Sequence, residues 1–225
     1  MNTLKYRRLK HYLPITSVLI MTGIILHFIW PKKDLITLIT DVSGYVAIVL
    51  LSISLIIGAF NVLMKRKNAV SSYFRRDIGI SGGILAVIHS ITGLFIHMRG
   101  NMWQYFSVQT DAGFKIRLDD FGIANYTGLL SALLIVVLLV TSSDYFFSKL
   151  QVKKWKNIQR LSYPMFILAI IHVIYYRLNN SGLLYSFYLP MVASVLVFQV
   201  SGFIIRIKNK NASISGKIDI QTKEI

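Results

Sequence analysis

Residues 129–140 read Leu-Leu-Ser-Ala-Leu-Leu-Ile-Val-Val-Leu-Leu-Val, a run without a single charged side chain. Mainly apolar residues continue on both sides, so the whole segment extends from about 121 to 147. A helix needs about 20 apolar residues to cross a hydrocarbon core of roughly 30 Å. This segment therefore predicts a transmembrane helix.

Five further segments have the length and composition of membrane spans. The first ends at Trp30-Pro31, where the proline stops a helix and the tryptophan suits a membrane interface. It is longer than the apolar core of a signal peptide, and no small-residue cleavage site follows, so we interpret it as a retained span. The sequence predicts an all-α polytopic membrane bundle with six transmembrane helices, near 13–30, 42–63, 78–97, 121–147, 158–178 and 184–205.

The composition supports a membrane protein and excludes several kinds of chemistry. Hydrophobic residues make up 54% of the 225 residues and charged residues 15%, whereas soluble domains carry about 25% charged residues. The net charge is +16, but a nucleic-acid-binding protein would not also be this apolar, so no nucleic acid is expected as a partner. The chain has no cysteine, which excludes disulfides, iron–sulfur clusters and catalytic thiols. The five histidines remain as the main candidates for cofactor chemistry.

The distribution of basic residues predicts the orientation. If the N-terminus is cytoplasmic, six of the 25 Lys and Arg residues fall in outer segments and the other 19 in inner segments, some of them next to anionic membrane lipid. This asymmetry predicts that both termini are cytoplasmic. Residues 1–208 then form one transmembrane domain, and 209–225 form a polar cytoplasmic tail that is too short to fold as a nucleotide-binding domain.

His89 and His172 lie at matched depths in two spans that run from inside to outside. Counted from inner starts at Asp77 and Ile158, they are 12 and 14 residues along, which is about 18 and 21 Å of helical rise. Two imidazoles that face each other across a bundle suit the axial positions of a b-type haem. An interhelical hydrogen bond or the proton relay of a transporter is the alternative.

Two glycines flank His89 on its predicted helix. Gly82 precedes it by seven residues, on nearly the same face, and Gly93 follows it by one turn. Such glycines would let a flat macrocycle approach the backbone. Close packing between helices explains them equally well.

The remaining histidines have weaker assignments. His97 lies about 80° around the helix from His89, at the outer boundary, which favours a place near a haem propionate or at the membrane interface. His27 reaches a similar outer depth on the first span, where it would contact a propionate, an electron acceptor or only the interface. His11 lies at the inner boundary, and no chemistry is assigned to it.

At this point the sequence resembles a known family. Residues 155–163, Trp-Lys-Asn-Ile-Gln-Arg-Leu-Ser-Tyr, followed by His172, resemble a segment of ferric reductase-like transmembrane domains. Residues 75–79, Arg-Arg-Asp-Ile-Gly, are similar to the start of another helix of that superfamily. It includes the haem-binding subunit of the bacterial methionine sulfoxide reductase system and, more distantly, NADPH oxidases and six-span metalloreductases. The resemblance covers about 40–205 and implies a haem-binding oxidoreductase, or its electron-transfer subunit, in a bacterial inner membrane.

One departure from the family pattern predicts the number of haems. The family often has an earlier histidine on the fifth helix, and this chain has Gln159 there, thirteen residues before His172. The equivalent position before His89 is Arg76. Neither residue is a usual haem ligand. We therefore expect one haem b, ligated by His89 and His172.

A single haem in the outer half predicts the course of electron transfer. Electrons from a cytoplasmic or membrane donor would pass through the haem to an outer acceptor, for which the resemblance suggests a ferric complex, a flavoprotein or a methionine sulfoxide reductase. A gap of about 20 Å on the inner side calls for a flavin (FMN or FAD) or a quinone near Arg76 and Gln159. The donor would be a separate reductase or the quinone pool. The alternative is a non-redox transporter or haem-binding scaffold, although a transporter would be expected to have buried midplane carboxylates.

Overall fold

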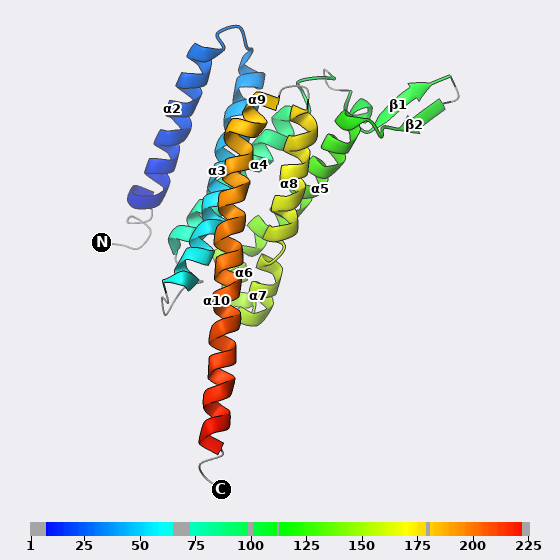
Figure 1. Ribbon diagram of the computed structural model, residues 1–225. Coiled ribbons are helices and arrows are strands. Elements are labelled where there is room, and N and C mark those ends of the chain that lie inside the picture. The colour runs from blue at the N-terminus through cyan, green and yellow to red at the C-terminus, as the bar shows by residue number, and fades with distance from the viewer. Residues whose placement is uncertain (1–7, 65–72, 99–100, 112, 179–180, 222–225) are drawn as a thin grey trace.

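The computed structural model describes residues 8–64, 73–98, 101–111, 113–178 and 181–221, and it is a bundle of long helices (Figure 1). The elements follow in this order: a π-helical segment Arg8–Tyr12, α2 Leu13–Ile29, α3 Leu35–Leu63, α4 Tyr73–Gly93, a 3-10 turn Met102–Tyr105, β1 Ser107–Thr110, β2 Gly113–Ile116, α5 Asp120–Thr141, α6 Asp144–Lys149, α7 Val152–Gln159, α8 Ser162–Arg177, α9 Ser181–Leu183, a second π-helical segment Leu184–Tyr188, and α10 Leu189–Gln221.

Most of the expected membrane spans are confirmed. Within the described residues, five helical stretches are long and apolar enough to cross a membrane: Leu9–Ile29, Leu35–Leu63, Asp120–Thr141, Lys153–Arg177 and Leu184–Asn209. The sixth expected span falls on α4, which is not among them because its first turns carry Arg75, Arg76 and Asp77. The polar tail continues α10 as a helix as far as Gln221. Six spans and the orientation of the termini stay predictions.

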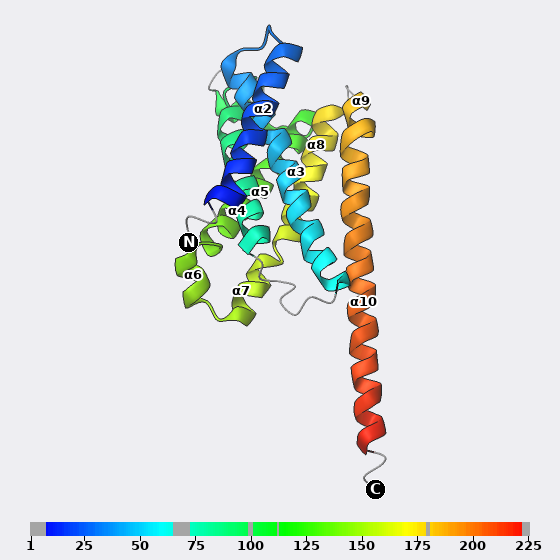
Figure 2. The same ribbon diagram turned by 90° about the vertical axis from the view of Figure 1, so that its left-hand side faces the viewer.

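Helix α3 is the centre of the bundle. It packs along α4 over most of its length and also contacts α10 and α2, while α5 packs along α8 and α4. Leu51 and Leu55 of α3 and Leu85 of α4 belong to the buried apolar core. Helix α2 has no buried residue and stands at the side of the bundle (Figures 1 and 2). The end at which α4 begins and α5 ends is called the inner end here.

Acidic caps fix the starts of two central helices. Asp34 accepts a hydrogen bond from the Thr37 N–H at 2.7 Å, and Asp119 accepts one from the Gly122 N–H at 2.7 Å. The Thr37 N–H lowers the pKa of Asp34 below its ordinary value, because it stabilises the ionised carboxylate. Both caps satisfy backbone donors that a helix start leaves unpaired. They therefore set the outer ends of α3 and α5.

The outer segment between α4 and α5 contains the only β-strands in the described part of the chain. Strands β1 and β2 pair antiparallel, with Gln109 opposite Phe114, and Gly113 adopts a φ of +107° in the turn, which favours glycine. Tyr105, 1% exposed, holds the base of this hairpin: its hydroxyl donates to the Gly93 carbonyl at 2.9 Å and accepts from the His97 N–H at 3.1 Å. The all-α class did not anticipate this hairpin.

Gly82 is expected to be essential for the α3–α4 contact. A Cβ there would lie 3.1 Å from Leu50 Cβ and 3.3 Å from the Ala47 carbonyl oxygen, whereas one at Gly93 would lie 3.7 Å from Thr40 Cγ2. Overpacking of this kind typically destabilises by about 1–3 kcal/mol. We expect Gly82→Val to lower the Tm of the detergent-purified protein by several degrees, more than Gly93→Val does. Equal Tm values for the two variants would show that Gly82 is not needed for close packing of α4 on α3.

Candidate functional site

The side chains of His89 on α4 and His172 on α8 come together inside the bundle. Their ring centroids are 6.1 Å apart, and the ring planes are inclined by 81°. The two residues are 83 positions apart in the sequence, and neither helix packs mainly on the other: α4 lies against α3 and α8 against α5. The pair therefore lies between two helix pairs, each of which contributes one imidazole.

Each imidazole is oriented by a backbone carbonyl of the helix beside it. His89 Nδ1 is 2.9 Å from the Thr40 oxygen on α3, and His172 Nδ1 is 2.7 Å from the Ala124 oxygen on α5. A carbonyl oxygen only accepts hydrogen bonds, so Nδ1 must carry the proton in both rings. In the neutral imidazole Nε2 then holds the lone pair, which is the form that binds a metal.

Glycine makes room for both hydrogen bonds. Gly44 follows Thr40 by one turn, and a Cβ there would be 2.6 Å from His89 Nδ1. Gly128 follows Ala124 by one turn, and its Cβ would be 2.6 Å from Nδ1 of the other histidine. Any side chain at either position would displace the imidazole. Sequence reasoning missed both glycines, because their importance appears only once each helix is paired with its neighbour.

The two glycines that the sequence did single out lie elsewhere. Gly82 and Gly93 both face α3, where added Cβ atoms would meet Leu50 and Thr40. These neighbours favour the packing interpretation, and a place for either glycine beside a cofactor stays a prediction.

The outer histidines differ in their surroundings. His97 contacts the rings of Phe121 and Tyr176, with centroids 5.6 and 5.8 Å away, and Tyr176 in turn lies 5.2 Å from the His172 ring. His97 is therefore connected to the histidine pair through one aromatic side chain. His27 contacts the ring of Phe28 at 6.1 Å on α2.

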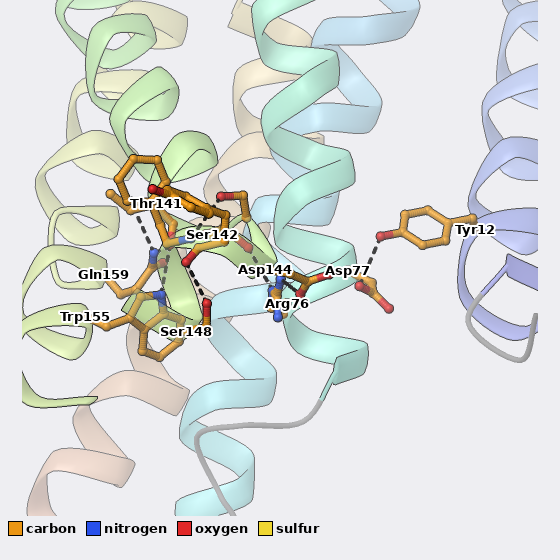
Figure 3. Close-up of polar contacts among 12 residues, drawn as sticks. Tyr12, Arg76, Asp77, Thr141, Ser142, Asp144, Ser148, Trp155 and Gln159 are labelled. Atoms are coloured by element: carbon orange, nitrogen blue, oxygen red, sulfur yellow. Dashed lines mark hydrogen bonds and ion pairs between the residues drawn. The ribbon is translucent and has the colours of Figure 1, made fainter. Parts of the chain in front are cut away.

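A cavity of about 990 Å³ occupies the inner half of the bundle, between α3, α4, α5, α7, α8 and α10. Arg76 and Gln159 both line it and meet at Ser142: Arg76 Nε donates to the Ser142 carbonyl at 2.9 Å, and Gln159 Nε2 donates to its hydroxyl at 3.1 Å (Figure 3). Arg76 also forms an ion pair with Asp144. The Trp155 indole N–H donates to the Thr141 carbonyl at 3.1 Å. The two positions predicted to replace inner ligands are thus brought together.

The α3–α4 pair repeats its histidine arrangement at the level of this cavity. Arg75 precedes His89 by fourteen residues and donates from Nε to the Ser54 carbonyl at 3.0 Å. A Cβ at Gly58, one turn further along α3, would lie 2.7 Å from the Arg75 guanidinium carbon. Carbonyl, glycine and bonded side chain are all displaced by fourteen residues from their outer counterparts. Arg75 therefore holds the position equivalent to His89, a position that the spacing of thirteen had assigned to Arg76.

The described residues contain no group of three or more His, Cys, Asp or Glu side chains that would hold a metal ion alone. The paired imidazoles would offer a bound metal two nitrogen ligands. Such a pair suits a metal whose other ligands come from a bound group.

The fold and its spans define an integral, multi-pass membrane protein of helical architecture. Residues 43–170 match the family model for the ferric reductase like transmembrane component. Because the match covers more than half of the chain, the protein belongs to this family of membrane proteins. The match includes His89 and ends two residues before His172. No curated protein gives a significant match. Membership of the family indicates an oxidoreductase domain that transfers electrons across a membrane.

Proposed function

We propose that the protein transfers electrons across the membrane through a single b-type haem held by His89 and His172. The observation that carries the proposal is the matched pair of imidazoles. Each ring donates a hydrogen bond from its Nδ1–H to a backbone carbonyl and keeps a lone pair on Nε2. A hydrogen bond between the two imidazoles would need the Nε2 of one ring to donate to the Nε2 of the other. Two rings with the same tautomer instead favour a shared metal.

The separation of the rings would leave room for one metal ion held by both Nε2 atoms. Two metal–imidazole bonds of about 2 Å each would account for about 4 Å of the 6.1 Å between ring centroids. The remaining roughly 2 Å corresponds to the two ring halves between nitrogen and ring centre. Two histidines are sufficient, because the macrocycle supplies the other nitrogen ligands to the iron.

When bound, the haem supplies one-electron chemistry at its iron. The protein holds the ligands and sets their basicity. The Thr40 and Ala124 carbonyls fix both rings in one tautomer and make Nε2 a stronger donor, which favours the oxidised metal. His97, connected through Tyr176, lies at the outer rim, where we place the propionates and the acceptor, with His27 at a similar level on α2.

We assign the inner cavity to the carrier that links the donor to the haem. Its basic lining includes Arg75, Arg76 and Arg206, which suit a flavin phosphate, and its aromatic lining includes Trp155 and Tyr163, which suit a flavin or quinone ring. Gln159 completes the wall between them. The donor would be a separate reductase or the quinone pool, and the acceptor a ferric complex, a flavoprotein or an extracytoplasmic redox protein.

The distribution of basic residues supports one orientation in the membrane. We propose α4 as the sixth span, with both termini cytoplasmic in a bacterial inner membrane, because 19 of 25 basic residues then lie on the inner side. The packing of α4 along α3 supports its place inside the bilayer. The charged first turns of α4 suit the inner membrane–water interface.

The first prediction concerns haem content. We expect pyridine haemochrome titration of the purified protein to give one haem per chain, and His89→Ala or His172→Ala to lose the bis-histidine spectrum. His97→Ala should keep it, because that ring is one side chain removed. Two haems per chain would contradict the single site, and a colourless protein from haem-replete cells would favour a transporter.

The second prediction concerns Gly44 and Gly128. Since an added Cβ would displace the imidazole, Gly44→Ala and Gly128→Ala are expected to lower haem occupancy at least several-fold or shift the midpoint potential of what remains. Gly23→Ala is the control, because its Cβ would approach Val42 only to 4.0 Å. Wild-type occupancy and potential in both variants would show that these hydrogen bonds do not orient the ligands.

The third prediction concerns the cavity. Extraction of the purified protein should release close to one FMN, FAD or quinone per chain, and Trp155→Ala should lower that amount, since one aromatic face is lost. Phe203→Ala on the exposed face of α10 is the control. Less than one carrier per ten chains would count against the assignment.

A further inference from the structure

A second cavity lies on the other side of α4, between α2 and the bundle. It has a volume of about 630 Å³ and is walled by apolar side chains along almost its whole length, among them Val18 and Leu26 of α2, Val49 and Ile53 of α3, and Ile78 of α4. Helix α2 runs along the outside of the bundle at this level (Figure 1). This α2 cleft plays no part in the proposed haem site.

The inner end of the α2 cleft contains a buried acid–imidazole pair. His11 Nδ1 lies 2.6 Å from Asp77 Oδ2, and Tyr12 donates from its hydroxyl to Asp77 Oδ1 at 3.1 Å (Figure 3). Asp77 is completely buried, and His11, 11% exposed, forms the wall of the cleft together with Phe74. A buried carboxylate at a membrane boundary is costly unless it is paired, and it is a functional candidate by default. Sequence reasoning had assigned no chemistry to His11.

The shape and polarity of the cleft limit the class of ligand. An apolar channel open to α2 suits a hydrocarbon chain taken from the bilayer, and the only titratable side chains besides tyrosine in its described lining, Lys10 and His11, lie at one end. Asp77 does not line the cleft itself but holds the His11 ring that does, so this end offers a paired imidazole to a head group that can give up a proton. The phosphodiester of a phospholipid, which Lys10 would suit, has no such proton, whereas a ring with a hydroxyl group donates one. Isoprenoid quinols combine this head group with an apolar tail.

We propose that the α2 cleft binds an isoprenoid quinol, with the head group at the His11–Asp77 pair, and that this quinol is the electron donor. The inference rests on the proposed function for the destination of the electrons. Oxidation breaks both O–H bonds and converts quinol to quinone, with release of two protons and two electrons. One proton goes to the His11–Asp77 pair and on to the inner aqueous phase, and the second follows. The two electrons would leave one at a time, by way of the carrier assigned to the inner cavity, towards the site that His89 and His172 form, and the outer acceptor would take them up.

The pair is suited to the role of proton acceptor. Asp77 holds His11 through Nδ1 and stabilises the imidazolium that forms when the ring gains a proton, as a buried carboxylate does for histidine in catalytic triads. Tyr12 holds the second carboxylate oxygen and fixes its orientation.

The cleft and the inner cavity lie on opposite faces of α4. Phe74 and Ile78 line the cleft, whereas Arg75 and Gly79 line the cavity. Asp77 precedes His89 by twelve residues on the same helix, which is about 18 Å of rise. The quinol would therefore deliver electrons from the inner level towards the histidine pair.

The test is anaerobic reduction of the purified full-length protein by decylubiquinol, followed by stopped-flow absorbance of the haem. Val18→Trp is expected to slow this reduction at least tenfold by filling the tail channel, and His11→Gln to slow it similarly by removing the proton acceptor. Ile20→Trp is the matched control, because Ile20 lies on the same helix and is exposed to a similar extent, 57% against 54% for Val18, but does not line the cleft. Wild-type rates in Val18→Trp and His11→Gln would overturn the proposal.

Two further readouts separate this proposal from the haem assignment. Dithionite, which needs no cleft, should reduce the haem equally in all variants, so loss of quinol reduction with intact dithionite reduction supports the cleft. Binding of the oxidised probe, decylubiquinone, should raise the Tm of the wild type and of Ile20→Trp but not of Val18→Trp. If the protein contained no haem, this Tm shift would still test the cleft. An equal shift in all three proteins, or none in any, would overturn it.

Discussion

The structure depends on two hydrogen bonds from imidazole Nδ1 to a backbone carbonyl, at Thr40 and at Ala124. A helix carbonyl already accepts from the amide one turn later, so a side chain reaches it only where that next residue is small. Gly44 and Gly128 meet this requirement. The chemistry of the pair therefore depends on the sequences of α3 and α5, although neither helix carries one of the two histidines.

The inner half uses the same backbone geometry for a different purpose. Arg75 takes the place of an imidazole over Gly58, and its guanidinium stays protonated at any physiological pH. The position equivalent to that of His89 thus holds a permanent cation beside a large cavity. On the opposite face of the same helix, Asp77 is paired with His11. The first turns of α4 thus place a cation at the inner cavity and a carboxylate behind the His11 ring that lines the α2 cleft.

The sequence predicted the helical class, five of the spans and the two histidines that the structure brings together, because apolar length and helical rise depend only on local residues. It could not predict Gly44, Gly128 or Arg75, since their roles depend on which helices pair and in which register. His11 looked like one more basic boundary residue, and only the approach of the N-terminal segment to Asp77 gives it a partner. The β1–β2 hairpin was missed because its strands are only four residues long and mostly exposed.

The division of the bundle into α3 with α4 and α5 with α8 has a consequence for assembly. Each pair is contiguous or nearly contiguous in the chain, and each contains one histidine together with the carbonyl and the glycine that orient it. Either half can therefore form its own hydrogen bond between histidine and carbonyl before it packs against the other half. The distance between the two halves is then fixed only when they pack together. A group bound between the two rings would act as a crosslink that holds one preformed half at a set distance from the other.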